Sequence, residues 1–247
     1  MENRFTAIID ETEKARKGVA ACAVVFLVLA VLCFSFSERV LLVLVRLLGR
    51  KLVSYSPEEG FLALASLSLY CAFVLTLPLA GYLLWKGVLL PRVPAWRRWG
   101  VPVIATATAL FAAGVLLGYF VLLPAGIGFL VGFETRDVRA LISAKKFISF
   151  CGTMLIALGL SFEAPLFSFF LAKLGWLKPA FFQNRWRHAV LACVVLAAVI
   201  TPTPDIYNMT LMATPLLGLY FVSYLVVRGV VAGRSVSTDP PESKPTP

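Results

Sequence analysis

One carboxylate stands alone inside an apolar stretch of the chain and is the first candidate for a functional group. Glu163 lies in Gly159-Leu-Ser-Phe-Glu-Ala-Pro165, and no other charged residue occurs from Phe147 to Ala172. A carboxylate at the bilayer centre costs about 3 kcal/mol on insertion scales, and intramembrane acids are more often functional than structural. We therefore expect Glu163, with Ser161 and Pro165 beside it, to have a functional role within the membrane. Packing against a neighbouring helix is the alternative.

The other reactive side chains do not form a catalytic set. His188 is the only histidine, so the chain offers no convincing Ser-His-Asp or Cys-His arrangement. The five cysteines lie inside or at the ends of apolar runs without metal-ligand spacing, and we interpret them as small apolar side chains. We expect no enzymatic activity, no metal and no cofactor.

The composition excludes a soluble domain. Of 247 residues, 60% are apolar and 15% charged, with a mean hydropathy of +0.87. A soluble domain is about half apolar and about a quarter charged. The predicted fold class is therefore an all-α polytopic membrane protein. The net charge of +10 fits basic residues gathered on the cytoplasmic side and does not require a nucleic-acid partner.

Six apolar ranges separated by charged loops predict six transmembrane helices. A helix needs about 20 residues to cross about 30 Å of hydrocarbon. The third range is longer than that, so we expect its helix to stop near Pro124. The expected spans are residues 18–37, 62–85, 101–123, 147–172, 189–200 and 207–227, within one domain of residues 1–234. The Pro-, Ser- and Thr-rich residues 235–247 predict a disordered tail.

Two segments leave alternatives open. The twelve apolar residues 189–200 cover only about 18 Å as a helix. Either this helix is re-entrant, or the turn from Thr201 to Asp205 lies below the membrane surface in a thinned bilayer. The segment from Glu38 to Leu52 is either an interfacial amphipathic helix or a continuation of the first helix.

The basic residues predict the orientation. Six crossings place both termini on one side, and the segments of that side carry fifteen Lys and Arg residues against eight on the other. Because Lys and Arg collect in cytoplasmic loops, both termini are expected to be cytoplasmic.

Polar residues at two helix starts predict an external cap. They can satisfy free N–H groups of the helices, and membership of an external surface is the alternative. The residues are Ser56, Pro57 and Glu59 at the second helix and Pro202, Pro204 and Asp205 before the sixth.

Four motifs in order resemble the TatC family of the twin-arginine protein translocase. They are Ser-Pro-x-Glu-x-Phe (Ser56 to Phe61), Gly-x-x-Phe-Glu-x-Pro (Gly159 to Pro165), Thr-Pro-x-Pro-Asp (Thr201 to Asp205) and Pro-Leu-Leu-x-Leu-Tyr (Pro215 to Tyr220). The resemblance implies a curved six-helix receptor for twin-arginine signal peptides of folded cargo. It also implies single-span TatA and TatB type partners, transport driven by the proton-motive force across the cell inner membrane, and a possible homo-oligomer. The resemblance implies that Glu163, with Ser161 and Pro165, faces the concave membrane side and is linked to signal insertion and partner contact.

The chain differs from the family where the arginine pair is expected to bind. The family has a Glu before a basic pair in the first cytoplasmic loop, and here Trp96 precedes Arg97 and Arg98. In the N-terminal pattern Arg16 aligns, but Lys14 stands at the Glu position. Our hypothesis is that three other cytosolic acids replace the missing loop Glu. These acids are Asp10, Glu11 and Glu13. The alternative is that they form only a solvated helix start.

Two other functions compete with a translocase receptor. A diverged relative of the same fold without twin-arginine recognition is the first. A small-solute transporter that uses Glu163 as a proton relay is the second, and it requires polar partners at the same depth. Ser161 and Thr153 are close in sequence, but the expected helices offer no charged partner.

Overall fold

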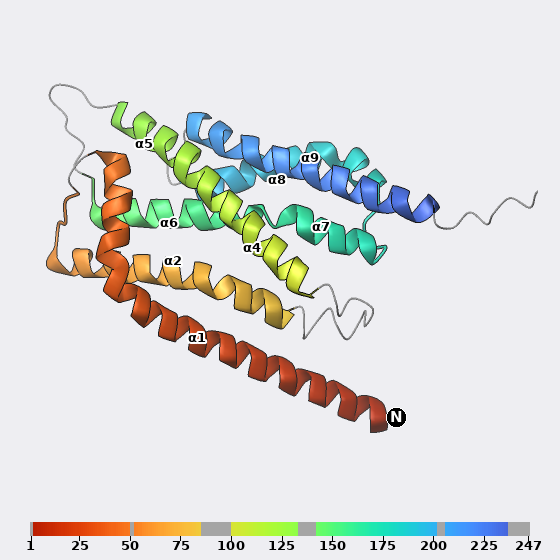
Figure 1. Cartoon of the computed structure of the whole chain (residues 1–247). Coiled ribbons are helices and arrows are strands. Elements are labelled where there is room, and N and C mark those ends of the chain that lie inside the picture. The colour runs from red at the N-terminus through yellow and green to blue at the C-terminus, as the bar shows by residue number, and fades with distance from the viewer. Residues whose placement is uncertain (1, 50–51, 85–99, 133–141, 202–205, 237–247) are drawn as a thin grey trace, which may run out of the picture. The chain divides into compact units, whose positions relative to one another are not determined.

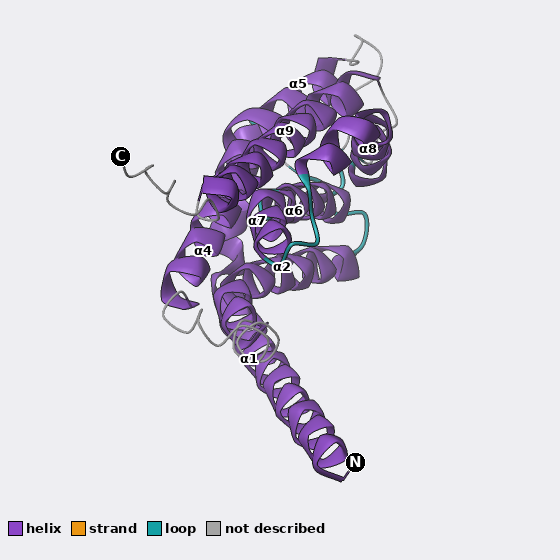
Figure 2. Cartoon of the chain, turned by 90° about the vertical axis from the view of Figure 1, so that its right-hand side faces the viewer, coloured by secondary structure: helices purple, strands orange, loops and turns teal. Residues whose placement is uncertain are grey.

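The computed structural model describes residues 2–49, 52–84, 100–132, 142–201 and 206–236. Within these ranges the regular structure consists of helices and one isolated β-bridge (Figure 1, Figure 2). The predicted all-α fold class is confirmed. The chain divides into two compact units, Met1–Gly159 and Leu160–Pro247.

The first unit begins with a long helix, α1 (Glu2–Leu48), which packs along α2 (Pro57–Leu84). Figure 1 shows α1 changing direction before its C-terminal segment. The Ser37 hydroxyl donates to the carbonyl of Phe34 at 2.7 Å, a type of bond that often bends helices. The segment from Glu38 is therefore a bent continuation of the first helix as far as Leu48. A position on the membrane surface remains a prediction.

The third apolar range differs from the expected helix. It forms α4 (Gly100–Leu117), a π-helical turn η3 (Gly118–Leu122) and α5 (Leu123–Gly132) without a break. The expected stop near Pro124 is therefore wrong. In η3 the Leu123 N–H donates to the Gly118 carbonyl, five residues earlier. This wider turn directly precedes Pro124, and such local adjustments let membrane helices continue through proline.

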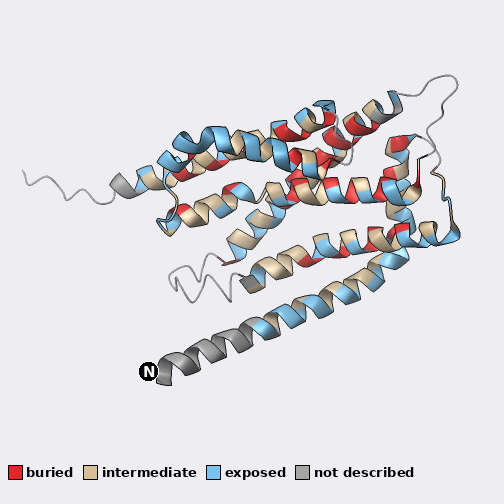
Figure 3. Cartoon of the chain, turned by 180° about the vertical axis from the view of Figure 1, so that it is seen from behind, coloured by how far each residue is buried: buried red, intermediate tan, exposed pale blue. Residues whose placement is uncertain are grey.

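The helix α6 (Ala144–Ser161) contacts its neighbours at glycines. A Cβ atom on Gly152 would lie under 3.0 Å from three ring atoms of Tyr70 in α2, and one on Gly159 would lie equally close to the Phe111 ring in α4. Small residues permit this approach, which supplies packing where no hydrophobic force drives helices together. The helix α6 and the η3–α5 junction also carry fully buried side chains (Figure 3).

The second unit contains α7 (Ala164–Lys173), α8 (Pro179–Ile200) and α9 (Ile206–Val236). Both α7 and α8 pack on α9, around a core of Ala172, Phe182 and Val227. The helix α8 begins ten residues before the predicted span, and Arg185 interrupts it with non-helical angles (φ −116°, ψ 16°). The polar residues ahead of Ala189 are thus helical as well.

Five helical segments of the described chain are long and apolar enough to cross a membrane. They are Gly18–Leu48, Pro57–Leu83, Gly100–Phe129, Ala144–Lys173 and Ile206–Gly233. The helix α8, which contains the short predicted span, is not among them. The helix α9 continues to Val236 and so includes the first two residues of the predicted tail. The rest of that tail lies outside the described residues.

The glycine contact between α6 and α2 gives a prediction about stability. Gly152→Ala should lower the unfolding free energy by about 1–3 kcal/mol, because the methyl group overlaps the Tyr70 ring. Gly81→Ala in α2 is the matched control, since a Cβ there meets nothing within 4 Å. The measurement is an SDS-induced unfolding titration of the detergent-purified chain. Equal midpoints for the two variants would contradict the prediction.

Candidate functional site

The break between α6 and α7 holds the intramembrane carboxylate. The helix α6 ends at Ser161, and α7 begins at Ala164, with Phe162 and Glu163 in a turn between them. The N–H of Glu163 donates to the Leu160 carbonyl at 3.1 Å, a tighter pattern than an α-helix. Pro165 follows, lacks an N–H and fits only the first turn of a new helix. The proline thus explains why the helix is interrupted at Glu163.

The Glu163 side chain is half-buried and does not cap α7. Its carbonyl accepts the N–H of Phe167 at 2.9 Å, so the backbone is held while the carboxyl group stays available. Lys173, at the other end of α7, is ten residues away, which is about 15 Å along a helix. Such a carboxyl group can accept a proton or pair with a cation brought by a partner. The neighbouring Pro165 is buried, and Ser161 is half-buried.

A second polar site joins two segments of the first unit at the start of α2. The Val53 N–H donates to the Ile142 carbonyl, and the Ala144 N–H donates to the Val53 carbonyl, both at 3.0 Å. The Glu59 carboxylate accepts one hydrogen bond from the Tyr55 N–H at 2.8 Å and another from the Ser143 hydroxyl. We call these contacts the Glu59 clasp. It fixes the residues before α2 to those before α6.

The other residues at this helix start have simpler roles. Pro57 is the first residue of α2, where its missing N–H costs nothing. The Ser56 carbonyl accepts the Glu59 N–H at 3.1 Å and the Ser54 hydroxyl at 2.6 Å. Sequence reasoning found Glu59 but missed Ser143. No motif surrounds Ser143, and only the tertiary pairing with Val53 brings it to the carboxylate.

The predicted signal-peptide residues are only partly placed. Asp10, Glu11 and Glu13 lie within α1, as does Arg16, which is exposed. The remaining predicted residues lie outside the described part of the chain. They are Trp96, Arg97 and Arg98 of the predicted first cytoplasmic loop and Pro202, Pro204 and Asp205 of the predicted external cap.

The family model described as "Sec-independent protein translocase protein (TatC)" matches residues 11–215. The chain belongs to the TatC family.

Curated relatives agree with this membership. The TatC protein of Deinococcus radiodurans is 34% identical over 197 residues, which cover 80% of this chain and 71% of that protein. The TatC protein of Campylobacter jejuni is 31% identical over 235 residues, 90% and 92% of the two chains. The chloroplastic TATC of Arabidopsis thaliana is 31% identical over 222 residues, 89% and 65% of the two chains.

A solved TatC structure has the same fold. The crystal structure of the twin-arginine translocase receptor TatC superposes with a TM-score of 0.80 at 26% identity, covering 90% of this chain and 99% of that chain. The chain is thus a TatC subunit of the twin-arginine translocase, a multi-pass membrane protein that serves transport rather than catalysis. These findings favour the translocase over both the diverged relative and the solute transporter.

The Glu59 clasp of this TatC protein predicts a stability effect. Glu59→Ala should lower the midpoint of SDS-induced unfolding, because two donors lose a charged acceptor. The adjacent, exposed Glu58 is the control, and Glu58→Ala should cost less than about 1 kcal/mol. In a double-mutant cycle measured by SDS titration, Glu59→Ala and Ser143→Ala should be less than additive. Full additivity would show that the two side chains do not interact energetically.

Proposed function

We propose that this chain is the receptor subunit that binds twin-arginine signal peptides and forms the core of a translocase for folded proteins. The observation that carries the proposal is the likeness to the TatC receptor structure over 90% of the chain. Single-span TatA and TatB type subunits are the proposed partners, and the proton-motive force is the proposed energy source. The fifteen basic residues on the side of the termini support a cytoplasmic-membrane location with both termini in the cytoplasm.

The acids of α1 are proposed to hold the arginine pair. A guanidinium group pairs with a carboxylate through two parallel hydrogen bonds, so recognition of two arginines needs acids on the cytoplasmic side. The first cytoplasmic loop has none, because no acid occurs between Glu59 and Glu134. Asp10, Glu11 and Glu13 are cytoplasmic in the proposed orientation and precede Gly18, where the first apolar span begins. A signal peptide bound there lies at the membrane surface, next to the span.

Glu163 is proposed to act after binding, during insertion of the signal peptide or contact with a partner subunit. Its half-buried carboxyl group lies in a helix break inside an apolar span. A carboxyl group that caps no helix costs free energy at that position in the resting protein, and we infer that a later step uses it. The chemistry therefore suits a step in which a polar or cationic group enters the membrane.

Export of a twin-arginine reporter, in a bacterial strain that lacks its own TatC, tests the proposed function directly. The chain should restore export of the reporter, and a Lys-Lys version of the same signal peptide should not be exported. Failure to restore export, with the chain present in the membrane at normal level, would indicate the diverged relative without twin-arginine recognition. The same strain and reporter serve for the two variants below.

The N-terminal acids give the first prediction of this proposal. Combined Asp10→Asn, Glu11→Gln and Glu13→Gln changes should reduce photocrosslinking to a twin-arginine signal peptide by about tenfold or more, because the charged acceptors are lost. Glu38→Gln, which alters an exposed acid elsewhere on α1, is the control and should leave crosslinking unchanged. Undiminished crosslinking in the triple variant would leave these acids as a solvated helix start.

Glu163 gives the second prediction. Glu163→Gln keeps the size of the side chain and removes its charge and its capacity to take up a proton. We expect the unfolding midpoint and signal-peptide crosslinking to match the wild type, while reporter export falls clearly below it. Normal export in this variant would reduce Glu163 to a packing residue. A lowered midpoint together with lost export would point to a structural role.

A further inference from the structure

The polar beginning of α8 is held on α9 by two tyrosines. The Tyr220 hydroxyl donates to the Phe182 carbonyl at 2.8 Å, and the Gln183 side-chain amide donates to the Tyr224 hydroxyl at 2.9 Å. Phe182 itself is buried against both tyrosine rings, with centroid distances of 5.1 and 6.1 Å. Arg185, whose backbone angles are non-helical, lies two residues after Gln183. The backbone around the kink therefore has a fixed position within this unit.

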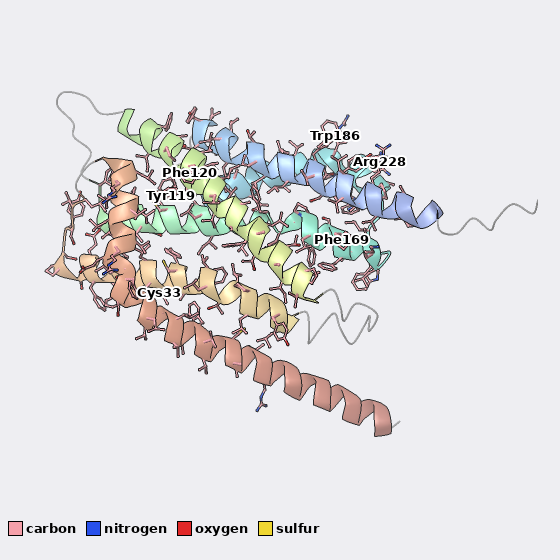
Figure 4. All side chains as sticks on the ribbon, viewed as in Figure 1. Cys33, Tyr119, Phe120, Phe169, Trp186 and Arg228 are labelled. Carbon is pink, nitrogen blue, oxygen red and sulfur yellow. The ribbon has the colours of Figure 1, made fainter. Side chains whose placement is uncertain are left out.

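Cationic residues adjoin, in the sequence, the residues that form the buried cluster around Phe182. Lys173 directly follows Ala172, and Arg228 directly follows Val227, and these two apolar residues form one buried cluster with Phe182. Lys178 and two arginines of α8 complete the group. We call these residues the α8 collar: Lys173, Lys178, Arg185, Arg187 and Arg228, with Trp176 and Trp186. Figure 4 shows Trp186 and Arg228 on the outer side of the unit.

Aromatic rings accompany three of the collar cations. Arg185 lies over the Phe181 ring at 5.3 Å, Arg187 over Trp186 at 5.5 Å and Lys173 over Phe169 at 5.7 Å. Trp176 and Trp186 are nevertheless 74% and 54% exposed. Tryptophan beside Lys and Arg is typical of the level where lipid headgroups meet hydrocarbon. The charge-free run that starts at Ala189 fits hydrocarbon directly beyond it.

Carboxylates are scarce among the described residues of the same unit. In its described residues Glu163 is the one carboxylate, and it lies about 15 Å along α7 from Lys173. A twin-arginine peptide is itself cationic, so it does not complement the collar. An anionic group at headgroup depth can supply the opposite charge.

We propose that the α8 collar binds the headgroups of anionic phospholipids. Headgroup phosphates accept hydrogen bonds from the collar arginines, and the two tryptophans lie among the neighbouring headgroups. In the orientation proposed above, these lipids belong to the cytoplasmic leaflet. This binding does not depend on signal-peptide recognition.

The test counts lipids retained by the full-length chain. Purified protein is exposed to equal amounts of phosphatidylglycerol and phosphatidylcholine in detergent, and native mass spectrometry gives the ratio of the two bound lipids. Wild type should prefer phosphatidylglycerol. Arg185→Gln with Arg187→Gln should reduce the preference by about fivefold for each arginine removed, and the corresponding Lys variant should retain most of it. Arg228→Gln, a change in α9 that leaves the α8 kink unaltered, should also reduce the preference for phosphatidylglycerol.

The matched control removes the same number of charges elsewhere. Arg39→Gln with Arg46→Gln alters two exposed arginines of α1, one of which also lies over a ring, Phe36 at 5.6 Å. It should leave the preference unchanged. An equal loss in both double variants would reduce the effect to net charge and overturn the proposal. Binding of a poly-glutamate peptide that needs Arg185 and Arg187, without any phosphatidylglycerol preference, would instead identify an acidic protein segment as the occupant.

Discussion

The structure depends on one constraint, which is that hydrocarbon offers no hydrogen-bond partner to the backbone. Each apolar segment must therefore satisfy its own N–H and C=O groups as a helix. Three departures from the regular helix have visible compensation. The π turn η3 precedes Pro124, the break at Glu163 precedes Pro165, and Tyr220 donates to the Phe182 carbonyl beside the kink of α8. The second and third of these breaks carry a charged residue, Glu163 and Arg185.

The features that follow from this constraint, the apolar spans and the lone intramembrane acid, could be predicted from the sequence. Apolar length between charges located the spans, because a charge inside hydrocarbon is costly, and the lone Glu163 could be recognised for the same reason. Helix ends were predicted less well. Charges mark where an apolar span ends, but a helix can continue beyond it, as α8 does by beginning at Pro179. The stop expected at Pro124 was wrong because the π turn before it, in which the Leu123 N–H donates to the Gly118 carbonyl, lets the helix continue. No local sequence pattern reveals this role of Gly118.

Long-range pairing was beyond the sequence for a different reason. The Glu59 clasp joins residues 84 positions apart, and a serine in an ordinary polar loop gives no sign of its partner. The close contacts at Gly152 and Gly159 are similar, since a glycine in an apolar helix is common and only the facing ring shows why a Cβ is excluded. Tyr220 belonged to a recognised motif, yet the acceptor of its hydroxyl became visible only in the packed unit.

The acidic and basic side chains of the second unit lie at different positions along its apolar span. Glu163 lies within an apolar span, whereas Lys173, Arg185, Arg187 and Arg228 gather around a cluster near the end of that span. Cations there stabilise one orientation, because anionic headgroups offset their charge and moving them through hydrocarbon is expensive. A fixed collar also sets the depth of α8, whose apolar part is too short to set it alone. The short apolar part of α8 and the basic collar then act together to set the position of this helix in the membrane.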